Sequence, residues 1–265
     1  MTEPRPRPRS SRAPVERLRV HQAIVDHLDL RPGDVLLDLG CGRGFTLATA
    51  TSRLSGVAMI GVDRDAGSLH AARLELAGRG APGLWVQADV GAPLPLGASS
   101  VSRVVCHDVL EYLDEPVGLL AEASRVMGPG ALSVWSHTDY EAIVIGGAER
   151  RLTRRVVGAY ADASSLGPGR SDAQMGRKVT AAVDRSPLRR TGVDAAALIA
   201  TELTGPAGLR VDDIASTVAR SAEQGASDVT VGEVEDWVAQ LKEADTRREF
   251  FYSQTAFVVT AVQPA

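Results

Sequence analysis

Short apolar runs alternate with amphipathic segments along most of the chain. The runs are rich in β-branched residues, and the segments between them repeat apolar residues at helical spacing. We expect strands at 34–40, 57–63, 84–89, 101–108, 128–139, 192–203 and 250–262. We expect helices at 15–30, 45–54, 65–79, 115–127, 173–188, 210–224 and 231–250. Apolar strands separated by helices indicate an α/β fold with a doubly wound, mostly parallel sheet covered on both faces.

Two regions depart from this alternation. Residues 140–170 are rich in Ala, Arg and Gly, and we expect a helix and a loop inserted over one end of the sheet. Residues 1–13 alternate Pro with Arg and cannot bury apolar area, which predicts a disordered arm. The expected organisation is therefore this arm, then one domain over 14–265 with a helical lid at about 139–175.

The charge distribution argues against a nucleic-acid partner. The chain has 265 residues and a net charge of −4, yet residues 1–19 hold six of its arginines against two glutamates. The remainder is therefore acidic, and aromatic residues make up only 4% of the chain. An acidic body with few stacking side chains is a poor match for a polyanion.

Cysteine usage and hydropathy favour a cytoplasmic protein. Cys41 and Cys106 lie far apart, without the spacing of a zinc site or a disulfide framework. No apolar stretch approaches the ~18 residues that a membrane-spanning helix needs, so we expect no membrane partner.

The stretch "LLDLGCGRGF" (36–45) holds the most informative motif. Gly40, Gly42 and Gly44 follow an expected strand directly, where glycine lets the backbone turn sharply and approach a ligand. The dinucleotide pattern G-x-G-x-x-G is not met, because Phe45 stands where it requires glycine. A tight structural turn is the alternative interpretation.

Three carboxylates end or flank the first three expected strands: Asp38, Asp63 and Asp89. Asp63 could accept hydrogen bonds from ribose hydroxyls, and Asp89 from an adenine amine. Helix capping for Asp63 and a plain turn for Asp89 are the alternatives. Asp38 would repel a pyrophosphate and suits a cationic ligand end. Together these features indicate a positively charged adenosyl compound, which is S-adenosylmethionine.

Several stretches resemble the class I methyltransferases, closest to the ubiquinone/menaquinone-type small-molecule branch. They are "VLLDLGCGRG", "IGVDRD", "VQADVGAPLPLGASSVSRVVCHDVLEYLDEP" and "LLAEASRVMGPGAL", which together cover about 34–135. The later "FYSQTAFVVTA" is similar to the family's final strand. The resemblance implies a Rossmann-like seven-stranded sheet whose last strand is antiparallel.

The resemblance also implies roles for individual residues. Asp38 would order the loop, and Asp63 would hold the ribose. The other implied cofactor contacts are Gly40, Cys41 and Gly42 at the methionine portion, Arg64, Asp89 and Val90 at the adenine, and the carbonyls of Cys106 and His107 at the amino group. S-adenosylhomocysteine would be the product.

Two histidines are candidates for a general base. His107 and His137 follow or end the fourth and fifth expected strands, where side chains should face the methyl group. A structural role is the alternative for each, and no metal-ligand spacing is present. Tyr112 stands where relatives often place a histidine, which leaves the identity of the base open.

The expected reaction is methyl transfer to an O, N or C nucleophile of a small organic acceptor, with specialised metabolism as one setting. A non-methylating enzyme, or a cofactor-binding assembly subunit on the same fold, is the alternative. The sequence also leaves a homodimer open.

Overall fold

The computed structural model describes residues 15–81, 83–164 and 171–265. The expected arm, residues 1–13, lies outside these ranges. The strands are β1 (Val35–Leu39), β2 (Ala58–Asp63), β3 (Gly83–Gln87), β4 (Val101–His107), β5 (Met127–Thr138), β6 (Val144–Gly146), β7 (Arg189–Ala200) and β8 (Phe251–Val262). The α-helices are α1 (Val15–Asp26), α2 (Phe45–Arg53), α3 (Ala66–Ala77), α4 (Pro116–Val126), α5 (Arg150–Ser164), α6 (Met175–Asp184), α7 (Gly205–Glu223) and α8 (Val231–Thr246). Two short 3₁₀ turns, η1 (Leu110–Tyr112) and η2 (Tyr140–Ala142), follow β4 and β5.

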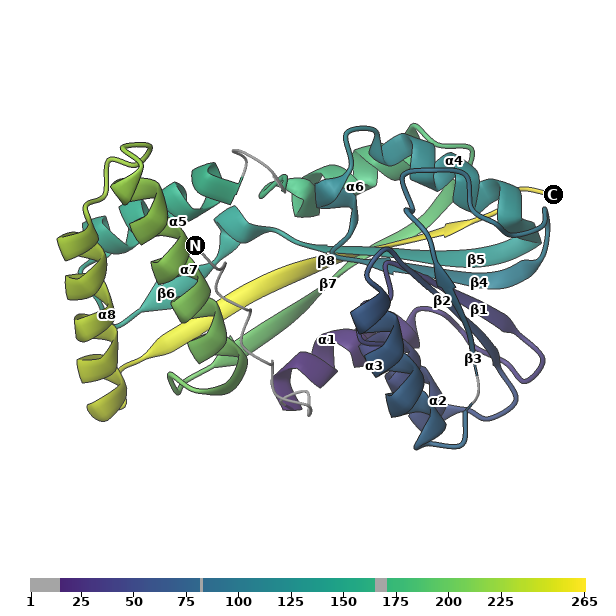
Figure 1. Cartoon of the computed structure of the whole chain (residues 1–265), viewed down its shortest axis with the longest axis horizontal. Coiled ribbons are helices and arrows are strands. Elements are labelled where there is room, and N and C mark those ends of the chain that lie inside the picture. The colour runs from purple at the N-terminus through teal and green to yellow at the C-terminus, as the bar shows by residue number, and fades with distance from the viewer. Residues whose placement is uncertain (1–14, 82, 165–170) are drawn as a thin grey trace.

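The strands of the described residues form one sheet in the order β3-β2-β1-β4-β5-β8 (Figure 1). Neighbours from β3 to β5 are parallel, whereas β8 is antiparallel to β5. Strand β7 is antiparallel to β8 and therefore parallel to β5. The expected mostly parallel α/β sheet with an antiparallel last strand is confirmed. The expected number of seven strands is wrong by one, because β6 pairs with the start of β8.

Helices cover both faces of the sheet, and alternate residues of each strand pack on opposite faces. Leu36 belongs to an apolar cluster with α1, α2 and α3, whereas its neighbour Leu37 belongs to a cluster with α4 and α6. Both residues are fully buried. This double burial explains why the strands appear as continuous apolar runs rather than as alternating ones.

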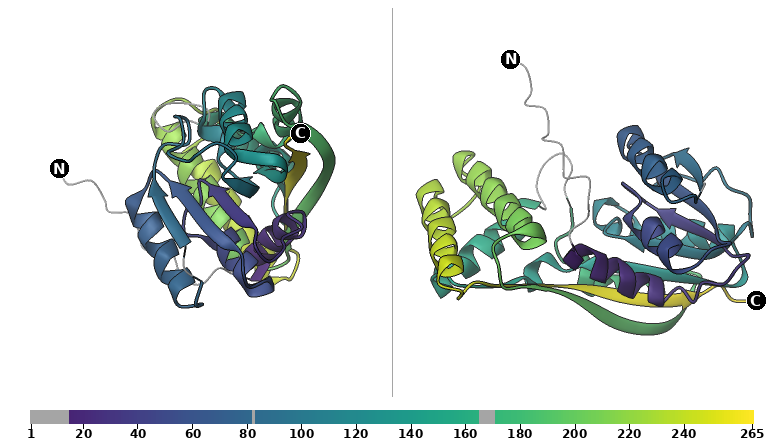
Figure 2. Two further views of the ribbon diagram at one scale, coloured as in Figure 1. Left: turned by 90° about the vertical axis from the view of Figure 1, so that its right-hand side faces the viewer. Right: turned by 90° about the horizontal axis from the view of Figure 1, so that it is seen from below.

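Helices α5, α7 and α8 pack together beside the N-terminal start of β8, and we call them the helical unit (Figures 1 and 2). Arg155 on α5 donates to Glu233 on α8 at 2.6 Å. The indole of Trp237 on α8, which is fully buried, donates to Thr153 on α5 at 3.2 Å. The segment expected as a lid thus supplies only one helix of this unit, and the other two come from residues 205–246.

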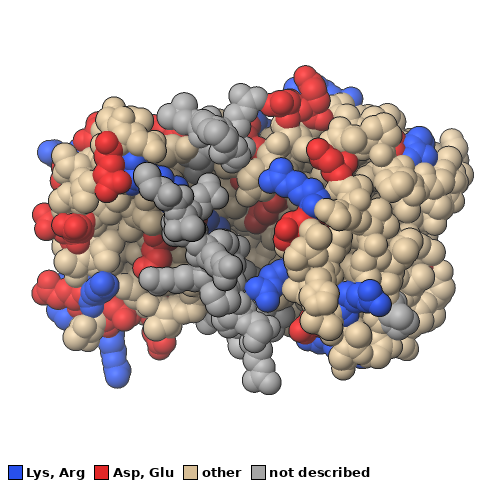
Figure 3. Space-filling view, in the orientation of Figure 1, with Lys and Arg blue, Asp and Glu red and all other residues tan. Residues whose placement is uncertain are grey.

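Acidic and basic side chains are mixed over the helical unit on the face drawn in Figure 3. Ion pairs on these helices include Arg155 with Glu233 and Arg210 with Asp213. Within the described ranges, no helix is long and apolar enough to span a membrane.

Candidate functional site

The glycine turn after β1 brings the backbone close to the neighbouring strands. The amides of Gly40 and Cys41 both donate to the carbonyl of Val62, at 2.8 and 2.9 Å. Gly40 has a φ of 70°, and a Cβ built on it would lie 2.3 Å from a methyl carbon of Val109. A side chain at position 40 would therefore clash and strain the backbone, so the turn requires glycine there.

Asp63, at the end of β2, holds this turn in place. One carboxylate oxygen accepts from the Gly42 amide at 2.8 Å, and the other accepts from the Asp65 amide at 2.9 Å. Asp65, rather than Asp63, caps helix α3, since its side chain accepts from the Ser68 amide. Helix capping therefore does not explain the carboxylate of Asp63.

Asp38 lies beneath the turn and is only 2% exposed. Its Oδ2 atom has no hydrogen-bond partner among the described residues. Burial, with a smaller contribution from the charge of Asp63, raises the pKa of Asp38 to about 8. Buried polar atoms are rarely left unpaired, so this orphaned oxygen indicates that a donor or cation belongs beside it.

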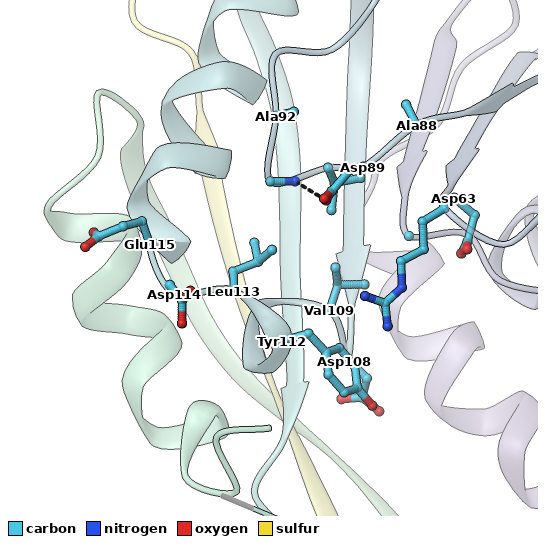
Figure 4. A pocket seen from close by; sticks show the side chains of 14 residues that line it. Asp63, Ala88, Asp89, Ala92, Asp108, Val109, Tyr112, Leu113, Asp114 and Glu115 are labelled. Carbon is cyan, nitrogen blue, oxygen red and sulfur yellow. Dashed lines mark hydrogen bonds between the residues drawn. The ribbon is translucent and has the colours of Figure 1, made fainter. Parts of the chain in front are cut away.

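A cavity of about 560 Å³ opens at the carboxyl ends of β1, β2, β3 and β4 (Figure 4). Asp89 lies on its wall and accepts a hydrogen bond from the Gly91 amide at 2.9 Å. The lining residues are Gly40, Asp63, Arg64, Ala88, Asp89, Val90, Gly91, Ala92, Asp108, Val109, Tyr112, Leu113, Asp114 and Glu115. Carboxylates outnumber basic groups on this wall, because Arg64 is the one basic residue in the set.

Half of the expected cofactor residues line this cavity, and the others lie close to it in the chain. Those on the wall are Gly40, Asp63, Arg64, Asp89 and Val90. Those off the wall are Asp38, Cys41, Gly42, Cys106 and His107. Cys41 and Cys106 are both buried thiols, and burial raises the pKa of each.

The turn after β4 contributes wall residues that we did not single out from the sequence. Val109, Leu113, Asp114 and Glu115 all lie on the cavity wall. They follow a strand that ends at the ligand-binding edge of the sheet, and this position is the signal that could have identified them.

The two candidate bases lie behind the cavity wall rather than on it. His107 Nε2 is 3.5 Å from a carboxylate oxygen of Asp108, and its Nδ1 is buried without a hydrogen-bond partner in the described chain. His137 is fully buried. Its Nδ1 lies 2.7 Å from the Thr138 carbonyl and 3.7 Å from Asp108 Oδ1, and burial lowers its pKa.

Asp108 lies on the cavity wall, 3.5 Å from His107 and 3.7 Å from His137. It has a φ of 52°, and its carboxylate accepts from the Thr138 amide at 2.7 Å and the Thr138 hydroxyl at 3.2 Å. Burial alone would raise its pKa, but the adjacent histidines, the Thr138 amide and Arg210 lower it to about 2. Asp108 is therefore a fixed negative charge on the wall.

Metal-binding geometry is not found in the described ranges of the chain, where no group of three or more His, Cys, Asp and Glu side chains could hold an ion.

Comparison with known proteins agrees with the geometry. Residues 37–134 match the model of a methyltransferase domain. An uncharacterized methyltransferase of Mycobacterium ulcerans (strain Agy99) is 38% identical over 131 residues, which are 49% of this chain and 49% of that protein. The chain thus spans about half the length of the curated relatives it matches.

Solved structures share the fold. A putative methyltransferase from Bacillus halodurans C-125 superposes with a TM-score of 0.62, covering 92% of this chain and 99% of that one at 14% identity. Geranyl diphosphate C-methyltransferase from Streptomyces coelicolor A3(2), solved with Mg²⁺, geranyl-S-thiolodiphosphate and S-adenosyl-L-homocysteine, gives 0.54 over 92% and 75% of the two chains at 16% identity. The methyltransferase resemblance inferred from the sequence is confirmed. Residues 37–134 match a methyltransferase domain, and the chain shares its fold with the solved methyltransferases.

Proposed function

We propose that this protein transfers a methyl group from S-adenosylmethionine to an O, N or C nucleophile of a small organic acceptor. The observation that carries the proposal is the buried carboxylate of Asp38, whose Oδ2 has no partner in the described chain, directly beneath the glycine turn. Asp63 and Asp89 line the cavity beside it. A positively charged adenosyl compound would satisfy all three carboxylates.

The wall residues fit such a ligand. Asp63 would accept from the ribose hydroxyls, Arg64 would lie beside the adenine, and Asp89 and Val90 would contact the adenine edge. Position 40 must be glycine, since even a Cβ there would overlap Val109. The methionine portion would therefore contact bare backbone at Gly40.

We infer that the remaining expected contacts come from backbone rather than from side chains. The amides of Cys41 and Gly42 would face the methionine portion, and the carbonyls of Cys106 and His107 its amino group. Backbone contacts of this kind are compatible with the burial of both cysteine side chains.

The bound cofactor would supply an activated methyl carbon that the acceptor displaces in line. The protein must then align the nucleophile, exclude water and, for an O–H or N–H acceptor, remove a proton. His107 and His137 remain our candidates for proton removal. Because neither lines the cavity, either would act through a group on the wall.

We propose that the helical unit, with the described part of the expected lid segment at about 139–175, closes over the acceptor; residues 165–170 of that segment lie outside the described residues. A small-molecule acceptor is the expected partner, and a homodimer and a cytoplasmic location remain predictions. The geranyl diphosphate methyltransferase and the Bacillus protein share only the fold with this chain, so neither identifies the acceptor.

The main alternative keeps the same cofactor site without methyl transfer, in a non-methylating enzyme or an assembly subunit. Incubation with S-adenosylmethionine and an acceptor panel separates the two. We expect a product heavier by one CH₂ unit, together with S-adenosylhomocysteine. A product of unchanged mass would favour the alternative.

Replacing Asp63 by Ala should weaken S-adenosylhomocysteine binding by roughly 10- to 100-fold, because both the ribose contact and the Gly42 hydrogen bond are lost. Isothermal titration calorimetry measures the effect. Asp65→Ala is the matched control: it removes the cap of α3 but no cavity residue, so it should lower stability slightly and leave binding unchanged. Equal binding by wild type and Asp63→Ala would contradict the assignment.

A further inference from the structure

Two polar side chains on the cavity wall, Tyr112 and Asp108, approach the same buried pair of residues from different elements. Tyr112 is half-exposed on η1 and directly follows the buried Glu111 in the chain; burial, followed by the charge of Glu111, raises the pKa of Tyr112. Asp108, at the end of β4, lies 3.7 Å from Nδ1 of His137. Behind the wall, His137 Nε2 and Glu111 Oε2 are 3.9 Å apart. These groups form a row of neighbouring polar side chains that reaches the cavity at Tyr112 and at Asp108, both of which Figure 4 shows on the wall.

The hydrogen bond of His137 fixes its tautomer. Nδ1 lies 2.7 Å from the carbonyl oxygen of Thr138, and a carbonyl oxygen only accepts, so Nδ1 carries the hydrogen. Burial lowers the pKa of His137, which keeps the ring neutral at neutral pH. Nε2 therefore presents a lone pair, and it has no hydrogen-bond partner among the described residues.

Glu111 presents the complementary group. It is 4% exposed, and burial, followed by the charge of Asp108, raises its pKa to about 8. At neutral pH the carboxyl group therefore holds a proton, and Oε2 has no partner in the described chain. A protonated carboxyl group can donate to His137 Nε2 through one oxygen while it accepts from Tyr112 through the other. The 3.9 Å gap exceeds a hydrogen bond by about 1 Å, so the relay requires the two side chains to approach each other during the reaction.

We propose that Tyr112, Glu111 and His137 form a proton relay that carries the acceptor's proton away from the cavity during methyl transfer. The inference rests on the proposed function and extends it to acceptors whose nucleophile is an O–H or N–H group. The nucleophile touches Tyr112 on the wall, and the buried pair behind it receives the charge. This arrangement resolves how a wholly buried His137 can act on a ligand that it does not touch.

The step balances without a further reagent. The acceptor oxygen or nitrogen forms a bond to the methyl carbon as the carbon–sulfur bond breaks, and the sulfur keeps the electron pair. The acceptor proton passes to the Tyr112 oxygen as the Tyr112 hydroxyl proton passes to Glu111. The proton that Glu111 already held on its second carboxyl oxygen passes to His137 Nε2, so Glu111 stays neutral. The imidazolium that results lies 3.7 Å from the Asp108 carboxylate, which stabilises its charge.

Each element that packs against Glu111 and His137 places a charged or titratable group near them. They are Asp108 and His107 at the end of β4, Tyr112 on η1, Tyr140 on η2, Asp172 before α6 and Arg210 on α7. Asp108 and Asp172 favour the imidazolium, whereas His107 opposes it. Arg210 favours the ionised form of Glu111, which Asp108 opposes.

Nitrogen NMR of the full chain, labelled with ¹⁵N-histidine and saturated with S-adenosylhomocysteine, tests the relay directly. We expect His137 to carry its proton on Nδ1 at pH 7, and its Nε2 signal to shift with a midpoint near 8 as Glu111 ionises. Glu111→Gln should abolish that step. Tyr112→Phe should move the midpoint to higher pH. The Tyr112 hydroxyl favours the ionised form of Glu111, and the variant lacks this hydroxyl. A proton on Nε2 at pH 7, or the same titration in Glu111→Gln, would overturn the relay.

The kinetic test uses S-adenosylmethionine with a panel of phenols, alcohols and amines. For any member that is methylated, Tyr112→Phe and Glu111→Gln should lower kcat by about 100-fold while KM for S-adenosylmethionine stays within about threefold. Glu75→Gln is the control, since Glu75 on α3 pairs with Arg79 and does not line the cavity. Unchanged kcat in both variants would overturn the relay. If the folded wild-type protein does not bind S-adenosylhomocysteine, the proposed function is overturned instead, so the two failures are distinguishable.

Discussion

Replacing Asp38 by Asn is expected to stabilise the cofactor-free protein while it weakens the cofactor site. The carboxyl group has a pKa of about 8 in the folded chain against 3.8 as its ordinary value, so the folded state holds a proton that the unfolded state releases. Stability of the wild type therefore falls as pH rises from about 4 to about 8. A shift of this size corresponds to several kcal/mol, and we expect the Asp38→Asn substitution to raise Tm by roughly 5–10 °C at pH 8.

Thermal unfolding of both proteins at pH 5 and pH 8 measures this effect. The Tm difference should be larger at pH 8, where the wild type carries the full cost of a buried, unpaired carboxylate. An Asp38→Asn protein that is less stable than wild type at both pH values would show that Asp38 has a stabilising partner.

Cofactor binding should respond in the opposite direction. A bound ammonium group favours the ionised form of Asp38, so binding of S-adenosylhomocysteine at pH 7 should release about one proton and strengthen between pH 6 and pH 8. Asp38→Asn should bind roughly 30- to 100-fold more weakly and release no proton at this site. Calorimetry in two buffers of different ionisation enthalpy counts the protons, and equal release by both proteins would contradict this role.

Gly40→Ala is expected to abolish measurable cofactor binding and to lower the free energy of unfolding by about 2–4 kcal/mol. A Cβ at position 40 would lie 2.3 Å from a Val109 methyl carbon and would sit on a backbone with a φ of 70°. Relief of that overlap moves either the turn or the segment after β4, and both line the cavity. Chemical denaturation and calorimetry report the two losses.

Two further variants separate the causes. Gly33 also has a positive φ, of 92°, with no atom within 4 Å of its built Cβ. Gly33→Ala should therefore show backbone strain alone, about 1 kcal/mol, with normal binding. The double variant Gly40→Ala with Val109→Ala removes the methyl overlap and should recover part of the stability. A Gly40→Ala protein that behaves like Gly33→Ala would argue against close packing at the turn.

Much of the sheet could be predicted because burial determines the pattern. Leu36 and Leu37 pack on opposite faces, so a run of apolar residues is the direct signature of a strand covered on both sides. Strand β6 has only three residues, which is too short for any periodicity. Local sequence patterns could not predict the helical unit either. Arg155 and Glu233 are 78 residues apart, and their pairing depends on the fold.

The sequence could predict those site residues whose position follows from the parallel order of the strands. Parallel strands end at one edge of a sheet, so Asp63 and Asp89 had to lie near the glycine turn. The direction of side chains beyond the strand ends is not fixed by that rule. Asp108 takes a φ of 52° as the chain leaves β4, and it lines the cavity whereas its neighbour His107 does not. Glu111 gave no signal, because its burial follows from the packing of η1 against the rest of the fold.

Calorimetric titration of the wild-type protein with S-adenosylhomocysteine, NAD⁺ and ATP tests the central claim most directly. The carboxylates around the cavity should accept an adenosyl ligand that carries an ammonium group and repel a pyrophosphate or triphosphate. We predict binding of S-adenosylhomocysteine with a Kd in the micromolar range, about −8 kcal/mol, and no measurable heat with the other two. Binding of NAD⁺ or ATP in preference to S-adenosylhomocysteine, or no binding of S-adenosylhomocysteine by folded protein, would contradict the account.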